Sequence, residues 1–353
     1  MVHRRRTTMK STISILSVCA ALASAAPLAA QEVTLKIADS LPADHIITRN
    51  TTDVFTARLK EEFGDRIEIE HYPAQQLAKA KDILSITQAG IADIGYIVPS
   101  YVSEKMPLGG VVELPGEIAS SCEGTLAFAE LIQPGGKLDT LEFQPNGVRV
   151  LYNVALSPYQ AIFSKRADVT SLEGFKGMKM RSNPGAMELS LQSAGATAVR
   201  MTPPEIFDAM TKGTVDGALL PFTSTFSYGL DQIVGSATQN ANFGSVGITY
   251  AISQRKWDSL PADIQEAMTR IGREVTESAC KAFDTAEAEL KDKLSEEGVT
   301  VFALDEEEAA RLRADFASVA DDWAAALDRR GKKGSEILAD FRAEVDALRN
   351  SGN

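Results

Sequence analysis

The alternation of strand and helix patterns near the N-terminus constrains the fold more than any other feature of the sequence. Apolar and polar residues alternate over residues 33–37, which is typical of a half-buried strand. The elements expected next are a helix over 54–63, a strand over 67–72, a helix ending at Gly90 and an apolar strand over 91–98. This β-α-β-α-β order predicts an α/β fold with a mainly parallel sheet and helices on both faces.

A similar pattern recurs later in the chain. A helix over 204–212 ends at Gly213 and leads into a strand over 215–220. Gly90-Ile91-Ala92-Asp93 matches Gly213-Thr214-Val215-Asp216, with glycine as a left-handed helix cap and aspartate at the mouth of a strand. Chance recurrence in an α/β protein is the alternative. A true repeat indicates two similar lobes, as does a length above ~300 residues.

The remaining patterns complete a two-lobed organisation. Strands are expected over 148–153 and 161–164, the first crossing between lobes, and a strand over 246–253 returns the chain. Long helices are expected over 262–297 and 306–330, with a short strand over 299–302 between them. The predicted domains are lobe I at 31–155 with about 246–285 returning to it, lobe II at 156–245, and a C-terminal helical segment at 286–353 that packs on the lobes.

The first thirty residues have the composition of a secretory signal peptide. Basic residues at 4–6 and 10 precede an apolar run over 13–25 and a small-residue stretch over 26–30. The apolar run is shorter than the ~20 residues of a membrane-spanning helix. We therefore expect export to the periplasm and cleavage near Ala30.

The composition of the mature chain excludes several functions. It keeps 32 basic and 48 acidic residues, and this net charge of −16 disfavours nucleic acid as a partner. Cys122 and Cys280 form either one disulfide or two free buried thiols. No cysteine or histidine cluster has the spacing of metal ligands, and no nucleophile and base or phosphate-binding glycine loop is present. We expect no metal, no cofactor and no enzyme activity.

The stretch Leu172-Glu173-Gly174-Phe175-Lys176-Gly177-Met178-Lys179-Met180-Arg181 is the most informative in the chain. It begins with a turn and ends in a strand that carries Arg181, before Ser182-Asn183-Pro184 starts a helix. Ligands of α/β sheets lie beyond the carboxyl ends of strands. A guanidinium matches a carboxylate with two parallel hydrogen bonds. Arg181 is therefore either a ligand anchor or a surface ion pair.

This stretch resembles the signature of the DctP-type periplasmic binding proteins of tripartite ATP-independent (TRAP) transporters. The resemblance continues through Gly195-Ala196-Thr197, residues 201–210 and Gly213-Thr214-Val215-Asp216-Gly217. Gly90-Ile91-Ala92-Asp93 and Trp257 with Leu260-Pro261 also match. The order and spacing agree over nearly the whole mature chain.

The resemblance implies two α/β lobes, joined by crossing strands and braced by a long helix, that close on a small organic acid. It implies that Arg181 pairs with the ligand carboxylate and that the partners are the membrane subunits of a TRAP transporter. We expect a monomer. The alternatives are a ligand-sensing periplasmic subunit and an exported enzyme acting on an organic acid.

Other residues are expected in the site from their places on strands and loops. Leu220 disfavours a hydroxylated sugar acid, because an apolar wall leaves ligand hydroxyls unpaired. Ser157-Pro158-Tyr159-Gln160 stands where some family members carry a second arginine, which favours a monocarboxylate or aromatic acid over a dicarboxylate. Phe226 and Tyr228 are either part of the site wall or part of the core. The predicted ligand-binding residues besides Arg181 are Ser40, His45, Tyr96, Asn153, Tyr159, Asn183, Leu220 and Phe222.

Overall fold

The computed structural model describes residues 1–3 and 32–351. Most of the predicted signal peptide, including its apolar run, lies outside the described residues. The chain divides into a unit of residues 1–30 and one compact unit of residues 31–353, which holds all the elements below. None of the helices in the described part of the chain combines the length and apolar character needed to cross a membrane.

Two mixed sheets form the framework of residues 32–351. The first has the order β2-β1-β3-β10-β4, and β10 is antiparallel to both of its neighbours. The second has the order β11-β9-β5-β8-β6-β7, and β5 is antiparallel to both of its neighbours. The strands are β1 Val33–Ala38, β2 Ile67–Tyr72, β3 Ile94–Ile97, β4 Val148–Ala155, β5 Gln160–Ser164, β6 Lys179–Ser182, β7 Thr197–Arg200, β8 Gly217–Leu220, β9 Val234–Thr238, β10 Gly247–Ser253 and β11 Thr300–Phe302.

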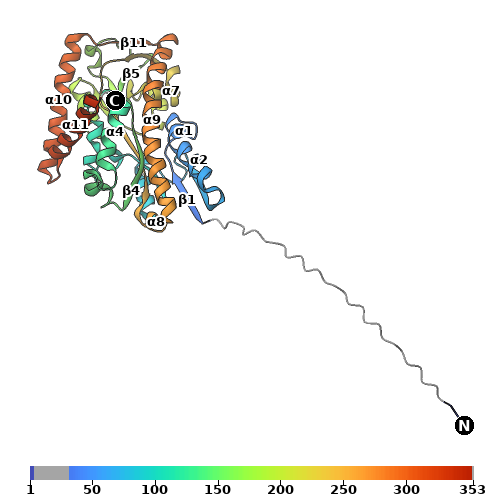
Figure 1. The fold of residues 1–353 in the computed structure, drawn as a ribbon. Helices are drawn as coiled ribbons and strands as arrows, with labels where there is room; N and C mark the ends of the chain where they lie inside the picture. Colours follow the sequence, from blue (N-terminus) through green and yellow to red (C-terminus); the bar gives the residue numbers. More distant parts are fainter. Residues whose placement is uncertain (4–31, 352–353) are drawn as a thin grey trace. The chain divides into compact units, whose positions relative to one another are not determined.

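Helices cover both sheets, so the predicted α/β class is confirmed (Figure 1). They are α1 Ile46–Asn50, α2 Thr52–Phe63, α3 Ile83–Ala89, α4 Ser121–Ile132, α5 Ala186–Ser193, α6 Ile206–Lys212, α7 Phe222–Ser227, α8 Gln254–Asp258, α9 Ala262–Glu296, α10 Glu306–Arg329 and α11 Gly334–Ser351. Two 3₁₀ segments also matter below, η3 Pro99–Val102 and η4 Leu108–Glu113. The predicted helix over 306–330 begins with a capping box between Asp305 and Glu308.

The repeated glycine and aspartate pattern is real in three dimensions. Gly90 and Gly213 both end a helix in the left-handed conformation, each with φ +75°. The Asp93 carboxylate accepts a hydrogen bond from the Lys36 backbone N–H of β1 at 2.9 Å. The Asp216 carboxylate accepts one from the Lys179 backbone N–H of β6 at 2.8 Å. The two halves of the chain therefore repeat one local design, in which the aspartate carboxylate binds the backbone of a neighbouring strand.

The chain crosses between the sheets in two short segments that pair with each other. Residues 156–159 lead from β4 to β5, and residues 239–246 lead from β9 to β10. The Leu156 N–H donates to the Val246 carbonyl at 3.0 Å, and the Tyr159 N–H donates to the Gly244 carbonyl at 2.7 Å. Gly244 has φ +105°, and an added Cβ would lie 2.2 Å from the Glu113 carbonyl oxygen. Only glycine fits this crossing.

Helix α9 contacts elements of both sheets. Its 35 residues span about 52 Å at 1.5 Å per residue. It packs on α4 and β4 on one side of the crossing and on α7 and β11 on the other, and Figure 1 shows it, in orange, running past β4 towards α7. Cys280 of α9 forms a disulfide with Cys122 of α4, which decides between the two alternatives left open by the sequence.

Two carboxylates of α9 also bind the first turns of other helices. The Asp284 carboxylate accepts from the Ser121 and Cys122 N–H groups at 2.6 and 3.1 Å, at the start of α4. The Glu287 carboxylate accepts from the Phe222 and Thr223 N–H groups at 2.7 and 3.0 Å, at the start of α7. Negative charge is favourable at a helix N-terminus, so these contacts attach both sides of the molecule to one helix.

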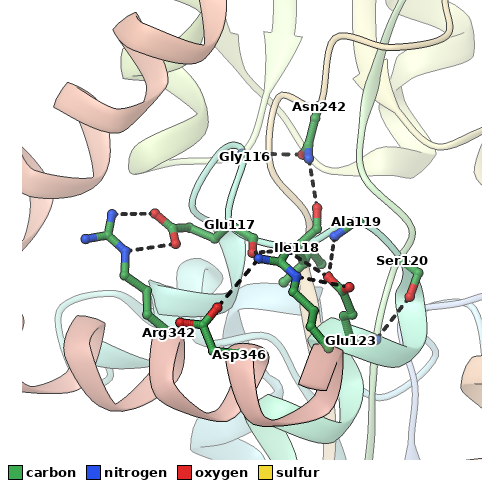
Figure 2. A network of polar contacts seen from close by, with 10 residues as sticks. Gly116, Glu117, Ile118, Ala119, Ser120, Glu123, Asn242, Arg342 and Asp346 are labelled. Atoms are coloured by element: carbon green, nitrogen blue, oxygen red, sulfur yellow. Dashed lines mark hydrogen bonds and ion pairs between the residues drawn. The ribbon is translucent and has the colours of Figure 1, made fainter. Parts of the chain in front are cut away.

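Figure 2 shows how the C-terminal helix is attached. Arg342 of α11 donates two hydrogen bonds to the Glu117 carboxylate, at 3.0 and 2.6 Å. Glu117 lies in the loop between η4 and α4, and this loop also contacts Asn242 of the second crossing segment. The Asn242 side-chain oxygen accepts a hydrogen bond from the Gly116 N–H at 3.4 Å, and its side-chain amide donates to the Ile118 carbonyl at 2.8 Å. The loop between η4 and α4 thus joins α11 to the crossing segment.

Candidate functional site

Arg181 is a fully buried cation at the carboxyl end of β6, with 0% of its surface exposed. Its Nε donates to the Met201 carbonyl at 3.0 Å, its Nη1 to the Leu219 carbonyl at 3.3 Å and its Nη2 to the Asn183 Oδ1 at 2.5 Å. All three acceptors are uncharged. Among the described residues no carboxylate forms an ion pair with this guanidinium. A buried charge without a counter-ion is costly, so the site is suited to an anion.

Three tyrosines, Tyr101, Tyr159 and Tyr228, interact with this cation, and Tyr96 lies beside Tyr101. Burial raises the pKa of Tyr96, Tyr101, Tyr159 and Tyr228, so their hydroxyls are neutral at pH 7. The Tyr101 hydroxyl interacts with both Arg181 and the Tyr96 hydroxyl, which opposes that rise in the pKa of Tyr101. Arg181 also acts electrostatically on Tyr159 and Tyr228. The site therefore combines aromatic surface with neutral hydroxyl groups.

The tyrosines come from both sheets. Tyr96 lies in β3 and Tyr101 in η3 directly after it, whereas Tyr159 leads into β5 and Tyr228 follows α7. Tyr96 and Tyr159 are buried, and Tyr101 and Tyr228 are partly exposed. Tyr101 and Arg181 thus lie at the carboxyl ends of strands in different sheets, the position where α/β sheets bind ligands.

His45 links the start of α1 to Tyr228, which follows α7. It is the N-cap of α1, where its Nδ1 accepts a hydrogen bond from the Ile47 N–H at 3.1 Å. Its ring lies 5.1 Å from the ring of Tyr228, centroid to centroid. Burial lowers the pKa of His45 to about 4, so the ring is neutral with its proton on Nε2. The buried Nε2 has no partner among the described residues.

Further polar atoms of this site are buried without a partner in the described part of the chain. The Asn183 side chain accepts from Arg181, but its Nδ2 donates to nothing. Ser100 Oγ and Glu113 Oε1 are also buried without a hydrogen bond of good geometry to the described residues. Buried polar atoms in native proteins are almost always hydrogen-bonded. This group of unused donors and acceptors around a cation indicates the place of a polar, anionic ligand.

The family model of bacterial extracellular solute-binding proteins, family 7, also called DctP, matches residues 37–326. The chain belongs to this family. The resemblance predicted from the sequence is therefore confirmed, and this solute-binding protein has the two-lobed fold of the family.

Solved structures and relatives agree with this assignment. A TRAP solute-binding protein from Rhodoferax ferrireducens in complex with benzoate has a TM-score of 0.82 and 22% identity, covering 91% of this chain and 100% of that one. A marine metagenome TRAP solute-binding protein specific for aromatic acids, in complex with 3-hydroxybenzoate, has the same TM-score and identity over 90% and 99%. The C4-dicarboxylate-binding periplasmic protein DctP of Rhodobacter capsulatus is 24% identical over 91% of this chain and 94% of its own.

The structure brings five of the nine predicted ligand-binding residues into one group. They are Arg181, Asn183, Tyr96, Tyr159 and His45. Ser40 is buried on the loop after β1, and Leu220 is buried at the end of β8, one residue from the carbonyl that binds Arg181.

Two predicted residues lie apart from this group. The Asn153 amide donates to the Thr125 carbonyl of α4, and the residue lines a groove of about 460 Å³ formed by α4, β4, α9 and α11. Phe222 lines a different groove, beside the crossing segments and Glu287 of α9. Neither Asn153 nor Phe222 is among the hydrogen-bond partners of Arg181, so the structure gives no support to their prediction as ligand-binding residues.

Four residues of the site were missed or left undecided. Ser100 and Tyr101 follow β3 in the same way that Ser40 follows β1, so the strand-end rule could have found them. Glu113 is the one charged residue in the apolar run of residues 106–115, and this isolated charge could have indicated a functional residue. Tyr228 was left between wall and core, and its contact with His45 places it at the site.

Proposed function

We propose that this solute-binding protein captures an aromatic monocarboxylate between its lobes and delivers it to the membrane subunits of a TRAP transporter in the periplasm. The observation that carries the proposal is Arg181, a buried guanidinium with no carboxylate partner among the described residues. A ligand carboxylate supplies the missing negative charge and accepts hydrogen bonds from the guanidinium. Enclosure strengthens that pair, because water is excluded from it.

The surroundings of Arg181 support an aromatic ligand. Arg181 interacts with Tyr101, Tyr159 and Tyr228, Tyr96 lies beside Tyr101, and the His45 ring packs on Tyr228. Aromatic rings pack favourably on one another in offset and edge-to-face geometries. Benzoate and 3-hydroxybenzoate, the ligands of the two similar structures, are acids of this class.

The distribution of cations supports one carboxylate rather than two. Arg181 is the single buried lysine or arginine among residues 32–351. A second ligand carboxylate would therefore be desolvated without a buried cation to pair with it, at a cost of several kcal/mol. The C4-dicarboxylate named for the relative from Rhodobacter capsulatus is accordingly the weaker candidate.

The proposed membrane partner and the proposed compartment are supported by different observations. Membership of the DctP family supports delivery to a TRAP transporter. The basic and apolar pattern of residues 1–30 supports export and cleavage near Ala30.

A comparison of ligands tests the proposed class. Calorimetric titration with benzoate, succinate and galacturonate should give the tightest binding for benzoate. A thermal-shift assay should agree, since a ligand at a hundred times its Kd adds about 2.7 kcal/mol to the free energy of unfolding. Tighter binding of succinate or galacturonate than of benzoate would remove the aromatic monocarboxylate from consideration.

Substitution of the anchor tests its role. Arg181→Ala should weaken the binding of benzoate by about 3–5 kcal/mol, because a buried charge pair loses one partner. Arg166→Ala is the matched control, since Arg166 also donates to backbone carbonyls in the second half of the chain, at 2.6 and 3.2 Å. The control should bind like wild type. Equal affinity of the Arg181→Ala variant and wild type would exclude Arg181 as the anchor.

A further inference from the structure

Glu113 is a buried carboxyl group with an unused oxygen. It ends η4 and is 2% exposed, and its Oε1 has no hydrogen-bond partner among the described residues. Ser100 of η3 is 6% exposed, and its Oγ makes no hydrogen bond of good geometry to the described residues. The two lie close together, since the Ser100 side chain and backbone interact with the Glu113 carboxyl group and oppose the rise in its pKa. A donor and an acceptor are therefore available side by side in the interior.

Glu113 lies close to the residues of the anion site. Its segment η4 contacts α5, the helix that follows Arg181 and Asn183 in the chain. Arg181 acts electrostatically on Glu113, and Glu113 acts on both Tyr101 and Tyr159. Burial raises the pKa of Glu113 to about 8, opposed by Ser100 and Arg181. The carboxyl group is therefore a neutral acid at pH 7 that can donate and accept a hydrogen bond.

Glu142 is a nearby buried carboxyl group with a structural role, and it provides a comparison for Glu113. Burial also raises the pKa of Glu142, to about 7. Both of its oxygens are occupied, because they accept from the Leu108 N–H at 2.6 Å and the Gly109 N–H at 2.8 Å. Glu142 thus holds the start of η4 in place. Glu113, at the other end of the same segment, leaves one oxygen free for a partner outside the chain.

We propose that Glu113 and Ser100 bind a hydroxyl group on the aromatic ring of the ligand, while Arg181 holds the ligand carboxylate. The proposal rests on the proposed function and narrows its ligand class to hydroxylated aromatic monocarboxylates. A hydroxyl group both donates and accepts, as a neutral carboxyl group and a serine do. A second ligand carboxylate at this position would meet an acidic group rather than a cation.

Ligands and variants can be combined to test this directly. Calorimetric titration should use benzoate and the 2-, 3- and 4-hydroxy isomers against wild type, Glu113→Met and Glu142→Gln. Wild type should prefer at least one hydroxybenzoate over benzoate by roughly tenfold, the effect of one satisfied buried hydrogen bond. Glu113→Met should lose that preference, so that it binds the hydroxybenzoates no more tightly than benzoate. Glu142→Gln should keep the preference.

A smaller substitution keeps the test decisive if Glu113→Met fails to fold. Ser100→Ala removes one hydroxyl group and should reduce the preference several-fold, whereas Glu113→Gln should retain most of it because the amide also donates and accepts. An unchanged preference in Glu113→Met or in Ser100→Ala would overturn the proposal.

The two proposals fail in different ways. If wild type binds none of the four acids, the proposed aromatic ligand class is wrong. If wild type binds benzoate but no hydroxybenzoate more tightly, the aromatic class survives and the role of Glu113 and Ser100 is refuted.

Discussion

Arg181 lies inside a protein whose residues 31–353 have a net charge of −16. The overall charge does not prevent the binding of an anion, since electrostatic interactions in solution are screened over about 8 Å at physiological ionic strength. Close to the guanidinium the groups are neutral, because burial raises the pKa of the surrounding tyrosines and of Glu113. The local field at the site is therefore set by Arg181 together with the buried Asp39, which acts electrostatically on Tyr96 and Tyr228.

His45 makes the stability of the protein depend on pH. Its pKa is lowered by burial from 6.5 to about 4, so the unfolded state binds a proton more readily than the folded state between these values. The contribution of neutral His45 is complete above pH 6.5 and is lost as the pH falls to 4, which amounts to about 3 kcal/mol. Other acidic groups titrate in the same range, so the effect must be isolated by substitution.

The substitution His45→Asn isolates the contribution of His45 to the pH dependence of stability. Asparagine can still cap α1 by accepting from a backbone N–H, but it cannot gain a proton. The variant should lose less free energy of unfolding than wild type between pH 6.5 and 4, as measured by urea unfolding at each pH. If the two unfolding profiles run parallel across this range, His45 is not the residue responsible.

The sequence predicts those site residues that follow the strand-end rule. Arg181 and Asn183 end and follow a strand whose hydrophobic pattern is local, so their position can be derived from the sequence. Asn153 could not be placed in this way, because β4 is buried on both faces and its apolar pattern does not distinguish them. Glu113 lies in a 3₁₀ segment without a strand or helix period, so its inward orientation depends on distant contacts.

At the scale of elements, the crossing segments explain why both sheets are mixed rather than mainly parallel. Each sheet takes in a strand that arrives from the other one, β5 after β4 and β10 after β9. These entering strands are antiparallel to their neighbours. Local periodicity predicted the strands, but the direction and register of pairing come from contacts between distant parts of the chain.

The disulfide between α4 and α9 should contribute strongly to stability. Cys122 and Cys280 are 158 residues apart, and closing so long a loop restricts the unfolded chain. The Cys122→Ser/Cys280→Ser double variant should lose about 2–5 kcal/mol of unfolding free energy in urea. A reductant should lower the stability of wild type and leave that of the double variant unchanged. Equal midpoints for both proteins without reductant would show that the bond contributes nothing.

At the scale of the whole molecule, two similar halves flank the proposed ligand site. Asp93 and Asp216 hold equivalent positions in the two sheets, and strands from both sheets end at Arg181 and the tyrosines. Arg181 is fully buried, so a ligand can reach it only when the lobes separate. The paired crossings at 156–159 and 243–246 are the places where such a motion can bend the chain.

A crystal structure of the protein with benzoate tests the central claim most directly. We expect both carboxylate oxygens within hydrogen-bonding distance of the Arg181 guanidinium, with the ring among Tyr96, Tyr101, Tyr159 and Tyr228. Benzoate bound elsewhere, for example in the groove formed by α4, β4, α9 and α11, with Arg181 still bonded only to Met201, Leu219 and Asn183, would contradict it.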